Sequence, residues 1–148
     1  MSEVIKALME RRSIRKFSPE AIDEKDLQTI LTAGTYAPSA RNTQPWHATG
    51  VVGREAITKL NEAVKTATGQ PGFDKYKGMA DSPGYTINYK DAPVFIIVSV
   101  DPSASFAAKE DGALMLGNIL LAAHALGLGA CWINQLGPID DEPAFRQV

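Results

Sequence analysis

The stretch that most constrains the fold is a predicted helix over residues 105–126, which is apolar on almost every side. Its apolar side chains occupy all faces rather than one stripe: Ala113, Leu114, Leu116, Ile119, Leu120, Leu121, Ala123, Ala125 and Leu126. Gly112 and Gly117 leave room for another element to approach closely. Gly127 is the residue expected to end the helix. A helix of this kind lies in a core or at a subunit interface, not on a wet surface.

The other predicted elements are helices with one apolar stripe and short apolar strands. Helices are predicted over residues 2–10, 23–33 and 54–66, and strands over residues 47–52, 93–100 and 130–134. Ser2 and Asp23 are the expected N-caps, and Gly34 is the expected residue just past the second helix. The run 93–100 is apolar without alternation, which is typical of a strand buried on both faces. Helices packed on such strands indicate an α/β sandwich.

Composition limits the class of protein. At 148 residues, 45% hydrophobic and 22% charged, the chain has the make-up of one soluble globular domain. The net charge of −2 gives no general reason to expect nucleic acid or a membrane surface as partner. The single cysteine, Cys131, excludes an intrachain disulfide. Without an apolar signal segment near the N-terminus, we expect a cytoplasmic protein.

Cations concentrate where the first helix ends. Residues 1–17 contain Lys6, Arg11, Arg12, Arg15 and Lys16. Cations also settle at helix C-termini because the helix dipole favours them there. The alternative is a phosphate clamp, since arginine binds phosphate oxygens through two parallel N–H groups and Ser13 adds a neutral donor.

A polar segment at residues 37–46 is enclosed by two prolines. Pro38 and Pro45 restrict the backbone, and Ser39, Asn42 and Gln44 between them both donate and accept hydrogen bonds. Such a segment suits a planar ligand whose rim alternates donors and acceptors. The same residue types also favour an ordinary turn.

Residues 66–92 are rich in glycine, proline and aromatic residues and predict a long loop. Long loops in compact domains are usually functional lids or mobile segments, although exposed tyrosines on a surface loop are also common. No metal site is expected, because His47 and His124 have no acidic or cysteine partners at ligand spacing.

Three segments together resemble the nitroreductase family of FMN-dependent oxidoreductases: residues 11–17, residues 37–46 and residues 126–133. They occur in the family's order and at its spacing. The resemblance implies a three-layer α/β (α+β) sandwich with a central mixed sheet flanked by helices. It also implies that residues 1–148 form one FMN-binding domain.

The resemblance implies a role for each matched position. Arg11, Ser13 and Arg15, with Arg12 beside them, would hold the phosphate and ribityl chain of FMN. Asn42 and Gln44 would reach the flavin ring or ribityl hydroxyls. Pro38, Ser39 and Ala40 would come from the partner subunit, because the family places two flavins at a homodimer interface. Trp132, Ile133 and Asn134 would run under the pyrimidine side and N5 of the flavin.

The implied activity is hydride transfer from NADH or NADPH to flavin N5, followed by two-electron reduction of a nitroaromatic, a quinone or a related acceptor (ping-pong). No catalytic side chain is assigned, because the flavin carries the difficult step. Family members usually continue into a further strand and a C-terminal arm, and this sequence ends at Val148 without it. Two alternatives stay open: a flavin-binding protein for storage or sensing without turnover, and a remnant that no longer holds FMN.

Overall fold

The computed structural model describes residues 2–68 and 92–133. The chain divides into two compact units. The first consists of Met1–Arg15, Ile22–Gly50 and Ile96–Trp132, and the second of Lys16–Ala21, Val51–Phe95 and Ile133–Val148. Among the described residues, no helix is long and apolar enough to cross a bilayer.

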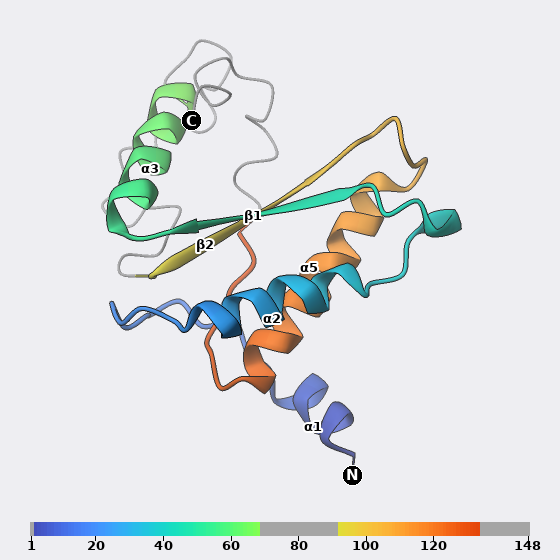
Figure 1. Cartoon of the computed structure of the whole chain (residues 1–148), viewed down its shortest axis with the longest axis horizontal. Coiled ribbons are helices and arrows are strands. Elements are labelled where there is room, and N and C mark those ends of the chain that lie inside the picture. The colour runs from blue at the N-terminus through green and yellow to red at the C-terminus, as the bar shows by residue number, and fades with distance from the viewer. Residues whose placement is uncertain (1, 69–91, 134–148) are drawn as a thin grey trace. The chain divides into compact units, whose positions relative to one another are not determined.

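Helix α1 (Glu3–Glu10) opens the first unit (Figure 1). Ser2 is its N-cap, as predicted, and the Ser2 side chain accepts a hydrogen bond from the Ile5 N–H at 3.4 Å. None of its residues is buried, although the helix is strongly amphipathic. Its apolar side chains are all at least 46% exposed: Val4, Ile5, Leu8 and Met9.

Helix α2 (Glu24–Thr35) packs against helix α5 (Ala108–Ala125), the apolar helix predicted from the sequence. Asp23 caps α2 through the Lys25 N–H at 2.8 Å, as predicted. The prediction that Gly34 follows the helix end is wrong, because α2 continues to Thr35. Gly34 is instead buried in the α2–α5 contact, where a Cβ atom would lie 2.9 Å from Ile119 Cγ1. Close packing of two helices therefore explains this glycine.

Helix α5 buries one face and leaves another open. Its buried residues recur at helical spacing and include Met115, Ile119 and Ala123. On the other side, Leu114 is 47% exposed. The helix ends as predicted at Gly127, which has a φ of 76°. The Gly127 and Leu128 N–H groups donate to the carbonyls of His124 and Ala123, the paired bonds of a Schellman cap.

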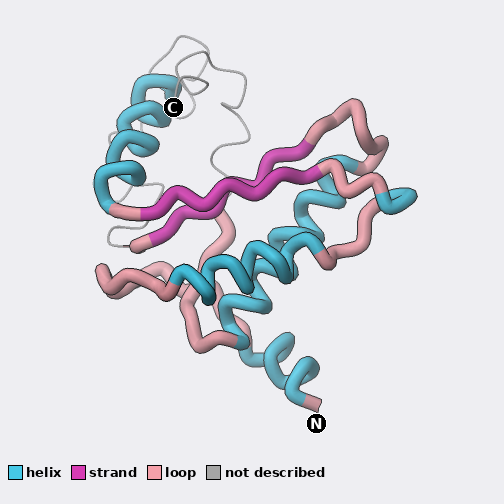
Figure 2. The backbone as a smooth tube through the Cα atoms, in the orientation of Figure 1, coloured by secondary structure: helices cyan, strands magenta, loops and turns pink. Residues whose placement is uncertain are grey.

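Strands β1 (Trp46–Val52) and β2 (Val94–Val100) pair in a two-stranded sheet, drawn as neighbouring magenta segments in Figure 2. The Asp101 N–H donates to Pro45 at one end, and the Gly53 N–H donates to Pro93 at the other. The strands are therefore antiparallel. The prediction that β2 is buried on both faces is wrong, since its residues are half-buried and Ser99 is exposed. In the described residues β2 has β1 as its only ladder partner.

The predicted strand over 130–134 is reduced, within the described residues, to one parallel bridge between Ser13 and Ala130. Gly129 allows this approach, because a Cβ there would lie 2.9 Å from Ile14 Cγ2. Residues 131–133 form no ladder, and Trp132 is 46% exposed. An apolar run predicts extended backbone, but it does not reveal how many neighbours the backbone will find.

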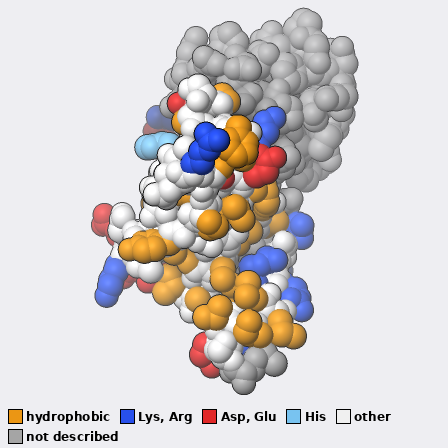
Figure 3. Space-filling model, turned by 90° about the vertical axis from the view of Figure 1, so that its right-hand side faces the viewer, with side chains coloured by type: hydrophobic (Ala, Val, Ile, Leu, Met, Phe, Trp, Pro, Cys, Tyr) orange, Lys and Arg blue, Asp and Glu red, His pale blue; other side chains and the backbone are white. Residues whose placement is uncertain are grey.

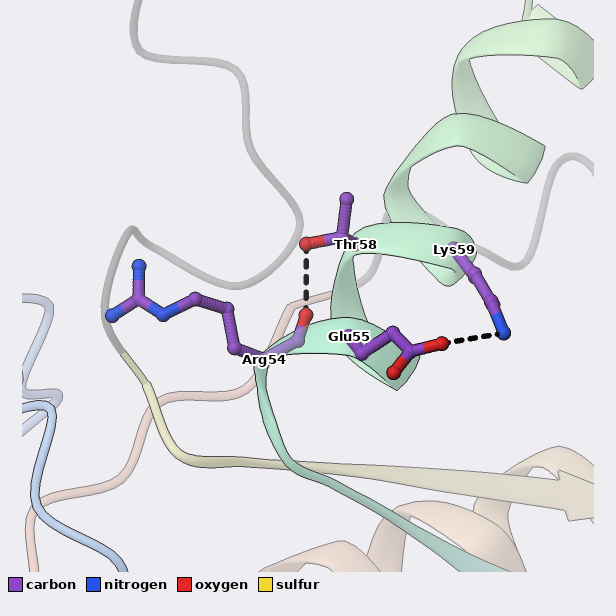
Figure 4. A network of polar contacts seen from close by, with 4 residues as sticks. All are labelled: Arg54, Glu55, Thr58 and Lys59. Atoms are coloured by element: carbon purple, nitrogen blue, oxygen red, sulfur yellow. Dashed lines mark hydrogen bonds and ion pairs between the residues drawn. The ribbon is translucent and has the colours of Figure 1, made fainter.

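Helix α3 (Arg54–Thr68) belongs to the second unit. Ile57 and Leu60 are buried, as predicted. Figure 4 shows the polar contacts of its first turns: Thr58 donates to the Arg54 carbonyl at 2.8 Å, and Lys59 pairs with Glu55 at 2.9 Å. The helix runs two residues beyond the predicted end. The rest of the loop predicted over 66–92 lies outside the described residues up to Asp91.

The nitroreductase-like α+β class predicted from the sequence is confirmed by structural neighbours reported below.

Candidate functional site

The polar segment between the two prolines adopts an unusual backbone. Arg41, Asn42 and Gln44 have φ values of 54°, 57° and 48°. This left-handed region is sparsely populated by residues other than glycine and costs roughly 1–3 kcal/mol per residue. Residues Ala40–Asn42 form one short 3-10 turn, η1. Strain of this kind gathers at binding and catalytic sites, so the backbone favours the ligand-binding interpretation over an ordinary turn.

Hydrogen bonds within this segment bring its predicted ligand-binding side chains together. The Gln44 N–H donates to Ser39 Oγ at 3.0 Å. The Gln44 side-chain amide donates to Asn42 Oδ1, also at 3.0 Å. Asn42 and Gln44 are both exposed, so their remaining donors and acceptors face outward. The segment can therefore present alternating donors and acceptors to one ligand edge.

An open pocket of about 470 Å³ adjoins this segment, a volume within the range of small-molecule sites. Its lining comes from the end of the segment and the adjoining ends of β1 and β2, with the turn after β2: Thr43, Gln44, Pro45, Trp46, His47, Ser99, Val100, Asp101 and Ala104. The Ser103 hydroxyl and N–H both donate to Asp101 and hold the pKa of its carboxyl below the ordinary value. Asp101 therefore brings a negative charge to the pocket at neutral pH.

The cationic segment begins at the C-terminal end of α1. Arg12 donates to the carbonyls of Met9 and Arg11, at 2.7 and 2.9 Å, and so takes the helix-end role that was the alternative to a phosphate clamp. For Arg11 and Arg15, the described part of the chain contains no side-chain hydrogen bond or ion pair. Arg11 is half-buried, whereas Ser13 and Arg15 are exposed. Their donors are thus available to an anion.

The bridge between Ser13 and Ala130 joins two of the three segments that carry the predicted site. The Ile14 N–H donates to the Ala130 carbonyl at 3.0 Å. The predicted phosphate ligands therefore lie beside the chain that leads to Trp132, as one flavin site requires. Ile133 belongs to the second unit, and Asn134 lies outside the described residues.

The segment with Pro38, Ser39 and Ala40 is not joined to the cationic segment within one chain. No hydrogen bond or ion pair between them occurs in the ranges 2–68 and 92–133. This separation agrees with the expectation that Pro38, Ser39 and Ala40 serve the partner's flavin, and that expectation stays a prediction.

Two polar residues beneath this segment were missed by sequence reasoning. Asp111 is only 3% exposed, and Ser105 is 7% exposed. Asp111 Oδ1 accepts from the Ala40 N–H at 2.9 Å, and Asp111 Oδ2 accepts from Ser105 Oγ at 2.7 Å. The available signal was a carboxylate at the start of an otherwise apolar helix, where it is costly to bury without partners.

These residues fit FMN in chemical type. Arg11, Ser13 and Arg15 supply unpaired donors for a phosphate, and exposed Asn42 and Gln44 supply amide groups for ring or ribityl polar atoms.

Comparisons with known proteins agree with this site. The model of the nitroreductase family matches residues 8–148. A provisionally named NADH dehydrogenase/NAD(P)H nitroreductase of Methanothermobacter thermautotrophicus is 36% identical over 142 residues, covering 94% of this chain and 64% of the relative. An FMN reductase [NAD(P)H] of Bacillus subtilis is 29% identical over 150 residues, covering 87% and 53%. The chain thus spans about half to two thirds of these relatives.

A solved structure is also similar. The crystal structure of a nitroreductase with bound FMN from Bacteroides fragilis superposes with a TM-score of 0.91 at 37% identity. The match covers 99% of this chain and 78% of that one. From the family match, the sequence identity and the shared fold, this chain belongs to the nitroreductase family.

Proposed function

We propose that this protein is an FMN-dependent oxidoreductase that uses NADH or NADPH to reduce nitroaromatic, quinone or related acceptors. The names of its relatives support the class: they include NAD(P)H nitroreductases, an FMN reductase and a nitroreductase with bound FMN. When bound, FMN would supply the redox chemistry, accepting a hydride at N5 and passing two electrons onward in a ping-pong cycle.

The chain's own residues would bind and orient the cofactor. Arg11 and Arg15 would neutralise the phosphate and Ser13 would add a neutral donor, because these groups have donors to spare. Asn42 and Gln44 would contact the flavin ring or ribityl hydroxyls. Trp132, Ile133 and Asn134 would pass beneath the pyrimidine side. Arg12 would assist the phosphate with the N–H groups that its helix-end contacts leave over.

The observation that carries this proposal is the bridge between Ser13 and Ala130. It brings the cationic segment and the segment before Trp132 side by side, although more than a hundred residues separate them in the sequence. An anion held by the first segment would therefore continue into a ring lying over the second.

A visible absorption spectrum tests the proposal. The purified protein is loaded with FMN, freed of unbound flavin by gel filtration, and titrated with NADH and then NADPH without oxygen. We expect a retained flavin spectrum that bleaches with at least one nicotinamide and returns when a quinone is added. Free FMN at equal concentration is the control. Retained flavin that never bleaches would indicate storage or sensing, and failure to retain flavin would contradict the proposal.

The site would be completed by a second copy of the chain. Pro38, Ser39 and Ala40 have no printed contact with the cationic segment of their own chain, so in this proposal they contact the partner's flavin across a homodimer interface. The exposed apolar side chains of α1, such as Leu8 and Met9, support such an interface. We also propose a cytoplasmic location, in keeping with the single cysteine.

A further inference from the structure

The 39–44 segment is strained but has few ties of its own. Its internal hydrogen bonds are local and join residues no more than five positions apart. Ser39, at its start, and Gln44, at its end, are connected through Ser39 Oγ. Bonds of this kind shape a turn, but they do not fix where the turn lies on the protein. An outside contact is needed to hold it in place.

Asp111 supplies that contact from the first turn of α5. Its carboxylate accepts from the Ala40 N–H at 2.9 Å, across 71 positions of sequence. Its other oxygen accepts from Ser105 Oγ at 2.7 Å, and Ser105 Oγ in turn accepts from the Ala107 N–H at 3.1 Å. One buried side chain thus ties the 39–44 segment to the turn before α5 and to α5 itself.

A second contact joins the same two places on the surface. The Arg41 guanidinium lies over the Phe106 ring, 5.7 Å from its centroid. Arg41 has left-handed backbone, and Phe106 is 83% exposed. The buried and exposed contacts flank Ala40 and Arg41, so together they oppose a swing of the segment away from α5.

Burial of Asp111 is difficult to explain by stability alone. In the described part of the chain its carboxylate has neutral donors and no ion pair, and a buried charge with neutral partners is costly. The N-terminal end of a helix partly offsets that cost. An apolar residue would pack this position without the charge, but it would leave the Ala40 N–H without an acceptor.

We propose that Asp111 is a positioning residue that holds the 39–44 segment in the conformation that receives FMN. The proposal rests on the proposed function for its ligand, whereas the tie between Asp111 and Ala40 can be tested without any ligand. Asp111 acts through the backbone and touches neither cofactor nor substrate in this assignment.

The test compares Asp111→Ala and Asp111→Asn with wild type. Asparagine keeps an acceptor for Ala40 but makes both bonds neutral, which roughly halves their strength. Met115→Ala is the matched control, because Met115 is buried on the same helix one turn further on and contacts Gly34 rather than the segment. It destabilises α5 without removing the tie.

Two readouts are used. The first is amide hydrogen exchange of Ala40 in the flavin-free protein, which should be slow in wild type and Met115→Ala, intermediate in Asp111→Asn and fast in Asp111→Ala. The second is FMN affinity from quenching of flavin fluorescence, at a temperature where every variant is folded. We expect a loss of about 10- to 100-fold for Asp111→Ala and about 2- to 5-fold for Asp111→Asn, from the worth of charge-assisted hydrogen bonds.

If Asp111→Ala does not fold, Asp111→Asn decides the question by its intermediate exchange and affinity. Wild-type exchange at Ala40 in the Asn variant, or an equal loss of FMN affinity in Met115→Ala, would overturn the positioning role. A wild-type protein that binds no FMN would instead contradict the proposed function, and the exchange measurement would still test the tie.

Discussion

Arg11 is the residue whose removal tests the phosphate clamp most directly. It is half-buried at the end of α1, its N–H donates to the Ala7 carbonyl, and its guanidinium has no partner within the described residues. Arg11→Ala should weaken FMN binding by about 1.5–3 kcal/mol, the worth of a hydrogen bond to a charged group, or roughly 10- to 150-fold in Kd. Isothermal titration of the flavin-free protein measures this loss.

Lys25→Ala is the control for this measurement. Lys25 is exposed in the first turn of α2 and belongs to none of the three segments of the predicted site. Removing its charge lowers the net charge equally and should leave FMN affinity within about twofold, because charges on the exposed surface are screened by salt. Equal losses in both variants would mean that Arg11 acts through the general field of the protein and not as a ligand.

At the scale of elements, the contact between α2 and α5 depends on Gly34. Gly34→Ala should gain roughly 0.5–1 kcal/mol from helix propensity. It should also lose about 1–3 kcal/mol by overpacking, because the added Cβ would meet Ile119 Cγ1 at 2.9 Å and Met115 Cε at 3.2 Å. Since both contacted side chains are buried, we expect a net loss near 1 kcal/mol in the free energy of unfolding, measured by urea denaturation.

Thr32→Ala provides the comparison on the exposed face of the same helix. Its helix propensity improves in the same direction, but no buried side chain lies in the way. This variant should be neutral or slightly more stable than wild type. A Gly34→Ala protein that is stabilised as much as Thr32→Ala would mean that Ile119 moves aside at little cost, and that Gly34 is not required for helix packing.

Local signals predicted the helices well and the strands less well. Ser2, Asp23 and Gly127 act on backbone groups within a few residues, so their roles can be read from the sequence. Gly34 gave the same local signal as a helix end, but its role depends on Ile119, which lies far away in the sequence.

The site shows the same division between local and distant causes. The polarity of Asn42 and Gln44 and the cations near Arg11 were visible in the sequence. The left-handed backbone, the tie from Ala40 to Asp111 and the bridge from Ser13 to Ala130 were not, because each depends on residues brought together by folding. Asn134 falls outside the described residues, and its role stays a prediction.

At the scale of the whole molecule, apolar surface remains uncovered on the first unit. Val4, Ile5, Leu8 and Met9 form the apolar face of α1, and hydrophobic side chains gather at the lower end of the face drawn in Figure 3, the end where α1 lies in Figure 1. Leu114 leaves the apolar helix α5 partly open as well. Contiguous apolar patches of this kind mark interaction sites, and a second copy of the chain is the partner proposed above.

Sedimentation velocity tests this proposal. The wild-type protein should sediment as a dimer, at twice the 15.9 kDa of one chain. Val4→Gln/Leu8→Gln should shift the population toward monomer, because each substitution removes apolar area worth about 25 cal/mol per Å² from the interface. Lys6→Gln, on the opposite face of α1, is the control and should stay dimeric. Dissociation should also lower FMN affinity, since Pro38, Ser39 and Ala40 would no longer reach the partner's flavin. A wild-type monomer that binds FMN tightly would contradict both the interface and the shared site.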